Sequence, residues 1–156
     1  MSSSQHNLGK IVGKKPLGFV PNRKGGCNNI TGYIDNIEEK TQQNKHFRQV
    51  LFTSQHVQLV VMNLKPNEEI GFEVHEITDQ FLRIESGEGK VIMNGEEKNF
   101  KVGDALIVPA GTNHNIINTS TTEELKLYTI YAPPHHKDGT IHKTKADAES
   151  DKEDHL

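Results

Sequence analysis

Apolar and polar residues alternate with a period of two from residue 47 onward, which is the spacing of β-strands that bury one face. The apolar runs are short and rich in β-branched and aromatic residues, which favour extended backbone. Turn residues separate the runs, and Asn94-Gly95 is the strongest hairpin signal among them. The pattern predicts strands over residues 47–53, 57–64, 70–75, 80–86, 90–93, 99–102, 105–108, 113–118 and 125–131.

Eight or nine short strands without a long helix between them predict an all-β domain, an antiparallel sandwich or barrel. The 156 residues suffice for one domain with a sizeable core. We place this barrel at residues 33–132. Residues 34–45 are polar and could form either a helical turn or a loop.

The two flanking segments are polar. Residues 1–32, rich in Gly, Asn, Lys and Pro, predict an irregular N-terminal arm. Pro133 and Pro134 end the last strand, because proline cannot donate a ladder hydrogen bond. Residues 133–156 are predicted to form a polar C-terminal segment that ends in a frayed tail. Its histidines could form a lid over the barrel mouth or belong to a solvated chain: His135, His136 and His142.

Charge and composition exclude several classes of protein. The net charge of −3 gives no basic footprint for nucleic acid, and no stretch approaches the ~20 apolar residues of a membrane helix. The first residues contain no apolar run that could act as a signal peptide. Cys27 is the only cysteine, so it has no internal disulfide partner, which fits a reducing compartment. We therefore expect a cytoplasmic protein without a nucleic-acid or membrane partner.

A cluster of glycine, proline and histidine near residue 110 resembles the second sequence motif of the cupin superfamily. The match holds at every motif position: Gly103, Pro109, Gly111, His114 and Asn118. The resemblance covers residues 47–131 and implies an antiparallel jelly-roll barrel. It is similar in particular to the small single-domain cupins that are often labelled mannose-6-phosphate isomerase-like.

An earlier cluster resembles the first cupin motif, with two departures. Gly87 closes the motif, and His75 falls where the family has the second His of a His-x-His pair. Glu73 stands where the first His belongs, and Gln80 stands where the family usually has Glu. The usual family set, three His and one Glu, carries one negative charge. The corresponding residues of this chain also carry one negative charge: Glu73, His75, Gln80 and His114. The carboxylate has therefore changed position and has not been lost.

The residues themselves support a metal site, independently of the resemblance. Glu73 and His75 are two positions apart on a predicted strand, so their side chains project to the same face. His114 would have to approach from elsewhere in the barrel. Two imidazoles and one carboxylate are the donor set of a facial triad for Fe(II), and they also suit Mn, Ni or Zn. Gln80 would be a weaker oxygen ligand or a hydrogen-bond partner of the ligands.

The predicted function is a metal-dependent enzyme that acts on a small polar substrate, a sugar, sugar acid or sugar phosphate, by isomerase- or lyase-like chemistry. Ring-opening cupins of unsaturated uronates are similar in carrying Gln at the position of Gln80. Glu73 and Gln80 are the candidate catalytic residues, and Glu73 could be a proton shuttle or a ligand. Two alternatives remain open: a non-haem iron dioxygenase, and a non-catalytic sensor or ligand-binding cupin.

The outward face of one predicted strand indicates an assembly. Phe81, Arg83 and Glu85 share the face opposite to Gln80. This mixture of apolar and charged side chains is compatible with a homodimer formed sheet to sheet, as the resemblance to cupins implies.

Overall fold

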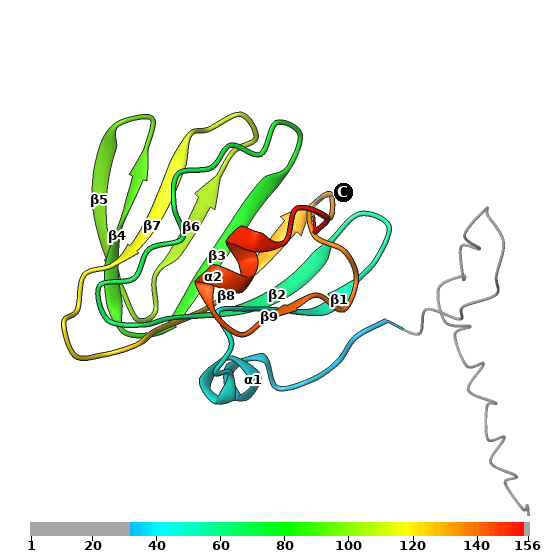
Figure 1. The fold of residues 1–156 in the computed structure, drawn as a ribbon, viewed down its shortest axis with the longest axis horizontal. Helices are drawn as coiled ribbons and strands as arrows, with labels where there is room; N and C mark the ends of the chain where they lie inside the picture. The colour runs from blue at the N-terminus through cyan, green and yellow to red at the C-terminus, as the bar shows by residue number, and fades with distance from the viewer. Residues whose placement is uncertain (1–31, 155–156) are drawn as a thin grey trace, which may run out of the picture. The chain divides into compact units, whose positions relative to one another are not determined.

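The computed structural model describes residues 32–154, which form two antiparallel sheets with an apolar core between them (Figure 1). The larger sheet has the strand order β6-β3-β8-β2-β1-β9, and the smaller has the order β5-β4-β7. The strands are β1 (Arg48–Thr53), β2 (Gln58–Leu64), β3 (Asp79–Ser86), β4 (Glu88–Met93), β5 (Glu96–Lys101), β6 (Ala105–Val108), β7 (His114–Asn118), β8 (Leu125–Ala132) and β9 (Ile141–His142). This is the predicted jelly roll. The predicted N-terminal arm lies outside the described residues, apart from Gly32.

The alternation along the strands decides which side chains enter the core. Directly opposed residues in antiparallel strands share a face of the sheet. The strand register therefore determines which residues of neighbouring strands lie together on the buried face. The central strands thus contribute a layer of fully buried aliphatic side chains: Val60, Met62, Leu64, Leu82, Ile84, Leu125 and Leu127. At one end of this layer the next row of inward positions is polar and aromatic, with Gln80 and Gln58 on either side of Tyr131. The candidate site lies at this end.

The turn between β4 and β5 confirms the hairpin signal in the sequence. Asn94 and Gly95 have φ angles of 49° and 86°. A two-residue turn with positive φ at both positions matches the twist of the flanking strands, and Asn and Gly adopt that conformation at little cost.

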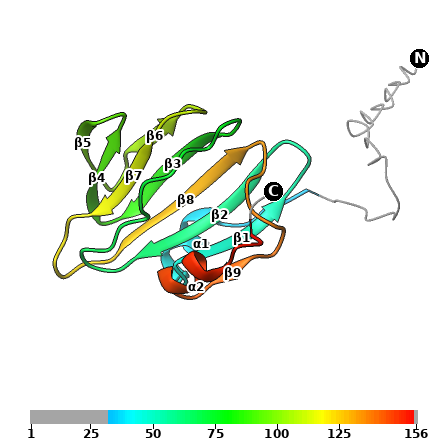
Figure 2. The ribbon, with the colours of Figure 1, turned by 45° about the horizontal axis from the view of Figure 1, so that its top comes forward.

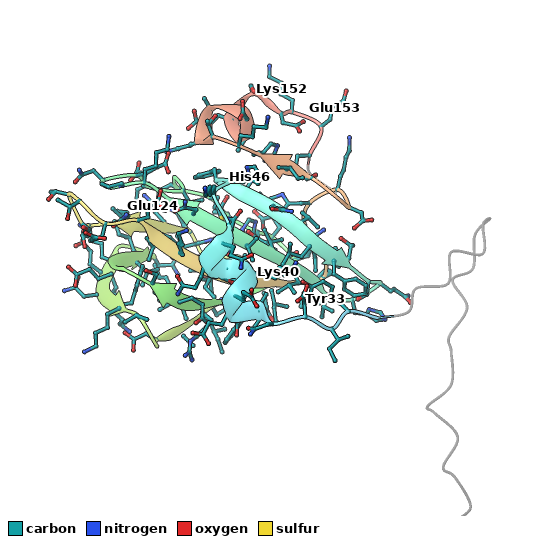
Figure 3. All side chains as sticks on the ribbon, turned by 90° about the horizontal axis from the view of Figure 1, so that it is seen from below. Tyr33, Lys40, His46, Glu124, Lys152 and Glu153 are labelled. Carbon is teal, nitrogen blue, oxygen red and sulfur yellow. The ribbon has the colours of Figure 1, made fainter. Side chains whose placement is uncertain are left out.

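The polar stretch before β1 forms a helix, α1 (Ile37–Gln43), so the open choice between a helical turn and a loop is decided for the helix. Asn36 caps it, because its side chain accepts a hydrogen bond from the backbone N–H of Glu39 at 3.1 Å. The Lys126 ammonium donates to the carbonyl of Gln42 at 2.7 Å. Lys126 alternates with buried residues on β8, so α1 covers part of the outer face of the large sheet, near the start of β8 (Figure 3).

The predicted strand over residues 70–75 is wrong as a regular strand. Only isolated bridges remain there, from Glu69 to Ile117 and from Glu73 to His114. Gly71 interrupts the ladder with a φ of 108°, and its N–H donates to the side-chain oxygen of Asn115. The segment nevertheless runs alongside β7 as an irregular fourth strand of the smaller sheet.

The prediction of a frayed C-terminal tail is also wrong for the described residues. This segment adds β9 to the edge of the large sheet and then forms α2 (Lys145–Ser150), which lies beside β9 (Figure 2). Thr144 and Asp147 form a reciprocal capping box at the start of α2. Ala148 packs against the core. In the part of the chain described, neither helix is long and apolar enough to cross a membrane.

The C-terminal segment is fastened by Asp154, whose side chain is only 1% exposed. One carboxylate oxygen accepts a hydrogen bond from His136 Nδ1 at 2.7 Å and lies 3.7 Å from a guanidinium nitrogen of Arg48. The other accepts from the hydroxyl of Thr140 at 2.7 Å. Burial alone would raise the pKa of this carboxyl, but the hydrogen bonds from His136 and Thr140 and the charge of Arg48 hold the pKa below its usual range. We call these four residues the Asp154 cluster.

Acid is expected to destabilise the fold through the Asp154 cluster. Burial lowers the pKa of His136 in the folded protein. Below the unfolded-state pKa of about 6.5, His136 therefore binds a proton more readily in the unfolded chain, which lowers the free energy of unfolding. The lowered pKa of Asp154 stabilises the fold above the unfolded value of about 3.9 and loses that contribution as the pH falls further. Urea unfolding of metal-free protein should therefore give a falling free energy from neutral to acid pH. The fall below about pH 4 should be smaller in Asp154→Asn, and an equal fall in both proteins would contradict this assignment.

Candidate metal centre

Glu73 and His114 are brought together by backbone pairing. The N–H of each donates to the carbonyl of the other, and both hydrogen bonds measure 3.0 Å. Opposed residues of such a pair direct their side chains to the same face. The pairing is supported nearby, because Asn115 donates to the carboxylate of Glu69 and accepts from the N–H of Gly71. The strand pairing therefore places a carboxylate and an imidazole side by side inside the barrel.

His75 completes the group two residues after Glu73, as the alternation predicts. Its Nε2 lies 3.4 Å from Glu73 Oε1, and the same oxygen lies 3.7 Å from His114 Nε2. The carbonyl of His75 accepts a hydrogen bond from the N–H of Gly111 at 2.8 Å, which holds the segment against the turn before β7. The predicted convergence of Glu73, His75 and His114 is thus present in the structure.

The hydrogen bonds of His114 and Gln80 orient their lone pairs. A carbonyl can only accept, so His114 Nδ1 donates its proton to the carbonyl of Thr112 at 2.9 Å, and the neutral ring has its lone pair on Nε2. Thr129 donates to the carbonyl of Phe81 and must accept from the Gln80 amide nitrogen, at 3.2 Å. Gln80 Oε1 therefore faces His114 Nε2 at 3.1 Å, and both atoms are acceptors.

This donor set fits a metal ion. Two facing acceptors repel each other unless a cation or a proton lies between or beside them. Both ring nitrogens of His75 are buried, and neither makes a hydrogen bond to any described residue, which leaves an unpaired polar group. The ligand atoms of Glu73, His75 and His114 all lie within 4.8 Å of one another. A divalent cation would satisfy these lone pairs together, with Gln80 Oε1 as a neutral fourth donor.

Glu73 supplies the negative charge of the site. Burial alone would raise the pKa of its carboxyl, but the contact with His75 and the electrostatic interactions with His75, Arg48 and His114 lower the pKa to about 2. The side chain keeps 26% of its surface exposed, whereas His75 and His114 are buried. The carboxylate is thus ionised at neutral pH and lies on the accessible side of the group.

Comparison with known proteins shows the family of this chain. Residues 60–131 match the model of the Cupin domain family, and this range contains all four predicted site residues. The crystal structure of BH2720 from Bacillus halodurans superimposes with a TM-score of 0.76 at 41% identity and covers 79% of this chain and 97% of that chain. The chain belongs to the cupin superfamily. Cupins commonly bind metal ions, and in this cupin the donor group described above is the candidate site.

Two relatives extend the comparison. The cupin is 49% identical over 122 residues to YrkC of Bacillus subtilis (strain 168), and the match covers 74% of this chain and 65% of YrkC. It is 47% identical over 113 residues to L612 of Acanthamoeba polyphaga mimivirus, and the match covers 70% of either chain. The matched region thus spans about two thirds of the length of these relatives.

The sequence left open whether His135 covers the barrel mouth or belongs to a solvated chain, and the structure places it against the candidate site. His135 lies with its ring centroid 4.1 Å from that of His75, and it stacks on Tyr131 at 5.6 Å. Tyr128 and Tyr131 are three residues apart on β8, so their side chains lie on opposite faces of the sheet. Tyr131 is the buried one and lines the site. Burial raises the pKa of the Tyr131 hydroxyl, so it stays protonated at neutral pH. The two prolines before His135 do not specify where the chain turns, so the sequence could not decide between the two alternatives.

A second group of potential ligands lies in the C-terminal segment and has a structural explanation. His142, Asp151 and Asp154 lie close together, and His142 Nε2 is 3.2 Å from an oxygen of Asp151. Asp154 already has a buried cation nearby, Arg48, and two hydrogen-bond donors. An additional divalent cation would lie close to the Arg48 charge and be repelled by it. We therefore assign this group to the attachment of the segment.

Proposed function

We propose that this cupin is a metal-dependent enzyme acting on a small polar substrate, a sugar, sugar acid or sugar phosphate, by isomerase- or lyase-like chemistry. The observation that carries the proposal is the convergence of Glu73, His75 and His114 within 4.8 Å, with the oxygen of Gln80 beside them. Fe, Mn, Ni and Zn all accept such a set.

The chain's own groups suggest how the site would work. Glu73, His75 and His114 would hold the ion, which supplies Lewis-acid polarisation of a substrate hydroxyl or carbonyl. A pKa of about 2 makes Glu73 a weak base at neutral pH, so its ionised carboxylate suits a ligand better than a proton shuttle. Gln80 is held by Thr129 and would fix the orientation of the ligands or hydrogen-bond the substrate.

To test the proposal, metal-loaded and chelator-treated protein are each incubated with sugars, sugar acids and sugar phosphates, and conversion of the substrate is followed by NMR. The proposal expects conversion of at least one class of substrate with Fe, Mn, Ni or Zn and none after chelation. Binding without conversion by any loaded form would favour the non-catalytic ligand-binding alternative.

One observation favours a second candidate function. Two histidines and one carboxylate are the donor set of non-haem iron oxygenases, which keep open positions for dioxygen and substrate. Oxygen consumption by the Fe(II)-loaded protein with a candidate substrate would support a dioxygenase. A fourth donor at Gln80 argues against it, because it would fill one of those positions.

We also propose that the cupin forms a homodimer through the outer face of the large sheet. Strand register places an apolar row across that face: Ile107, Phe81, Ile130, Leu59 and Phe52. Ile107 is 66% exposed. Beside the row, Arg83 Nε lies 3.7 Å from Glu85 Oε1, so these two charges are paired within one chain and leave no net charge beside the apolar row. Sedimentation equilibrium should give twice the mass of the 17.5 kDa chain, and Ile107→Lys should give the monomer.

A further inference from the structure

His135 occupies a distinctive place next to the metal centre. Its ring packs edge-on against that of His75, with the centroids 4.1 Å apart. It is half-buried, whereas His75 is buried. Among the described residues, the compact ligand group comprises Glu73, His75 and His114 and does not include His135. The imidazole therefore lies beside a candidate ligand and is more exposed than that ligand.

The position of His135 is fixed by a buried amide. Gln58 is completely buried, and its side-chain oxygen accepts from the backbone N–H groups of His135 at 3.3 Å and His136 at 2.9 Å. Its amide nitrogen donates to the carbonyl of His136 at 2.6 Å and to the hydroxyl of Thr53 at 2.9 Å. All of the hydrogen-bonding groups of this amide are thus used on neighbouring elements. The Gln58 side chain therefore fixes the backbone at His135 and His136.

The ring of His135 is held as well. It stacks on Tyr131 with the planes 27° apart, and it packs edge-on against His136. His136 is in turn fastened to Asp154 by a 2.7 Å hydrogen bond. A half-exposed imidazole that is fixed from several sides loses little entropy when it binds a ligand, which is the condition for a preorganised contact.

From this geometry we propose that His135 donates a hydrogen bond to an oxygen or anionic group bound on the open side of the metal centre. The inference deepens the proposed function and rests on it, since it needs a metal at Glu73, His75 and His114. The class of ligand follows from the donor: an imidazole N–H recognises a carboxylate, an alkoxide or a similar anion. His135 is then a ligand-contacting residue and not a metal ligand.

The experiment uses Co(II) as the metal and azide as the anion, and both steps are followed by the visible absorption of the cobalt. His135→Phe keeps an aromatic ring against Tyr131 and removes the N–H donor. His135→Gln keeps a donor. The matched control is His56→Ala, because His56 is an exposed histidine outside the site.

His135→Phe is expected to bind Co(II) within about twofold of wild type but azide about tenfold more weakly, the effect of one hydrogen bond to a charged group. His135→Gln should recover part of the azide affinity, and His56→Ala should match wild type.

Two results would overturn the inference on its own: unchanged azide affinity in His135→Phe, or loss of Co(II) binding as severe as in His75→Ala, which would make His135 a ligand. If wild type takes up no Co(II), the proposed metal centre falls and the inference falls with it. The two failures are distinguishable, because cobalt uptake is recorded before azide is added.

Discussion

His75→Ala is expected to abolish high-affinity metal binding, with a loss of more than about 100-fold. Changes to residues that only support metal ligands already cost 10- to 100-fold in affinity, so removal of a ligand should cost more. The fold should survive, because neither ring nitrogen of His75 hydrogen-bonds a described residue, and the Glu73 carboxylate, 3.4 Å from His75 Nε2, is still 26% exposed to water. Elemental analysis of protein purified without added metal, and competition with a chromophoric chelator, measure the loss.

His114→Ala should lose metal to the same extent, because His114 Nε2 points at Glu73 and Gln80. His56→Ala is again the control and should retain the metal of wild type. Metal should also raise the melting temperature of wild type and of the control but not of the two ligand variants, since an ion that binds only the folded state stabilises it. Metal retained by His75→Ala, or a wild type that binds none, would contradict the assignment of the centre.

Asp154→Asn is expected to lower the free energy of unfolding by about 3 kcal/mol, the usual effect of removing one member of a buried ion pair. The guanidinium of Arg48 is 7% exposed and would be left buried without its counter-charge. Burial also removes the screening by water that makes surface ion pairs weak. Urea denaturation at neutral pH, with the metal removed by chelation, measures the change.

Glu153→Gln is the matched control for this substitution. Glu153 is the neighbouring residue, its side chain is 87% exposed, and it lies 3.5 Å from the ammonium of Lys137. Figure 3 shows Lys152 and Glu153 pointing away from the barrel. An exposed pair of this kind contributes less than about 1 kcal/mol, so Glu153→Gln should be close to wild type. Equal losses in the two variants would show that the Asp154 cluster does not fasten the segment.

Much of the fold could be predicted because strands leave a local signature. Alternation in β3 and β8 reflects one buried and one outer face, and Asn94-Gly95 specifies its own turn. The error at residues 70–75 has a local cause, since Gly71 breaks a ladder that the alternation alone would continue. The error at the C-terminal segment has a distant cause. A charged, polar sequence indicates a solvated tail, and only the burial of Asp154 against Arg48 reverses that.

The candidate site divides in the same way. Parity along one segment was enough to place Glu73 and His75 on one face. The pairing of Glu73 with His114 joins residues about forty positions apart, and the spacing of residues within a strand does not encode such a contact. The direction of the Gln80 oxygen depends on Thr129, on another strand. The approach of His135 to His75 depends on the Gln58 amide.

The sequence by itself determined the all-β character, the spacing of the strands and the residues from which a metal site could be built. Each of these depends on neighbours within a few positions, where backbone geometry is fixed by residue type and period. Only the tertiary structure decided which lone pairs converge, which carboxylates are buried and which histidines border the site. Those properties depend on strand register and on burial, and both arise from contacts between segments that are far apart along the chain.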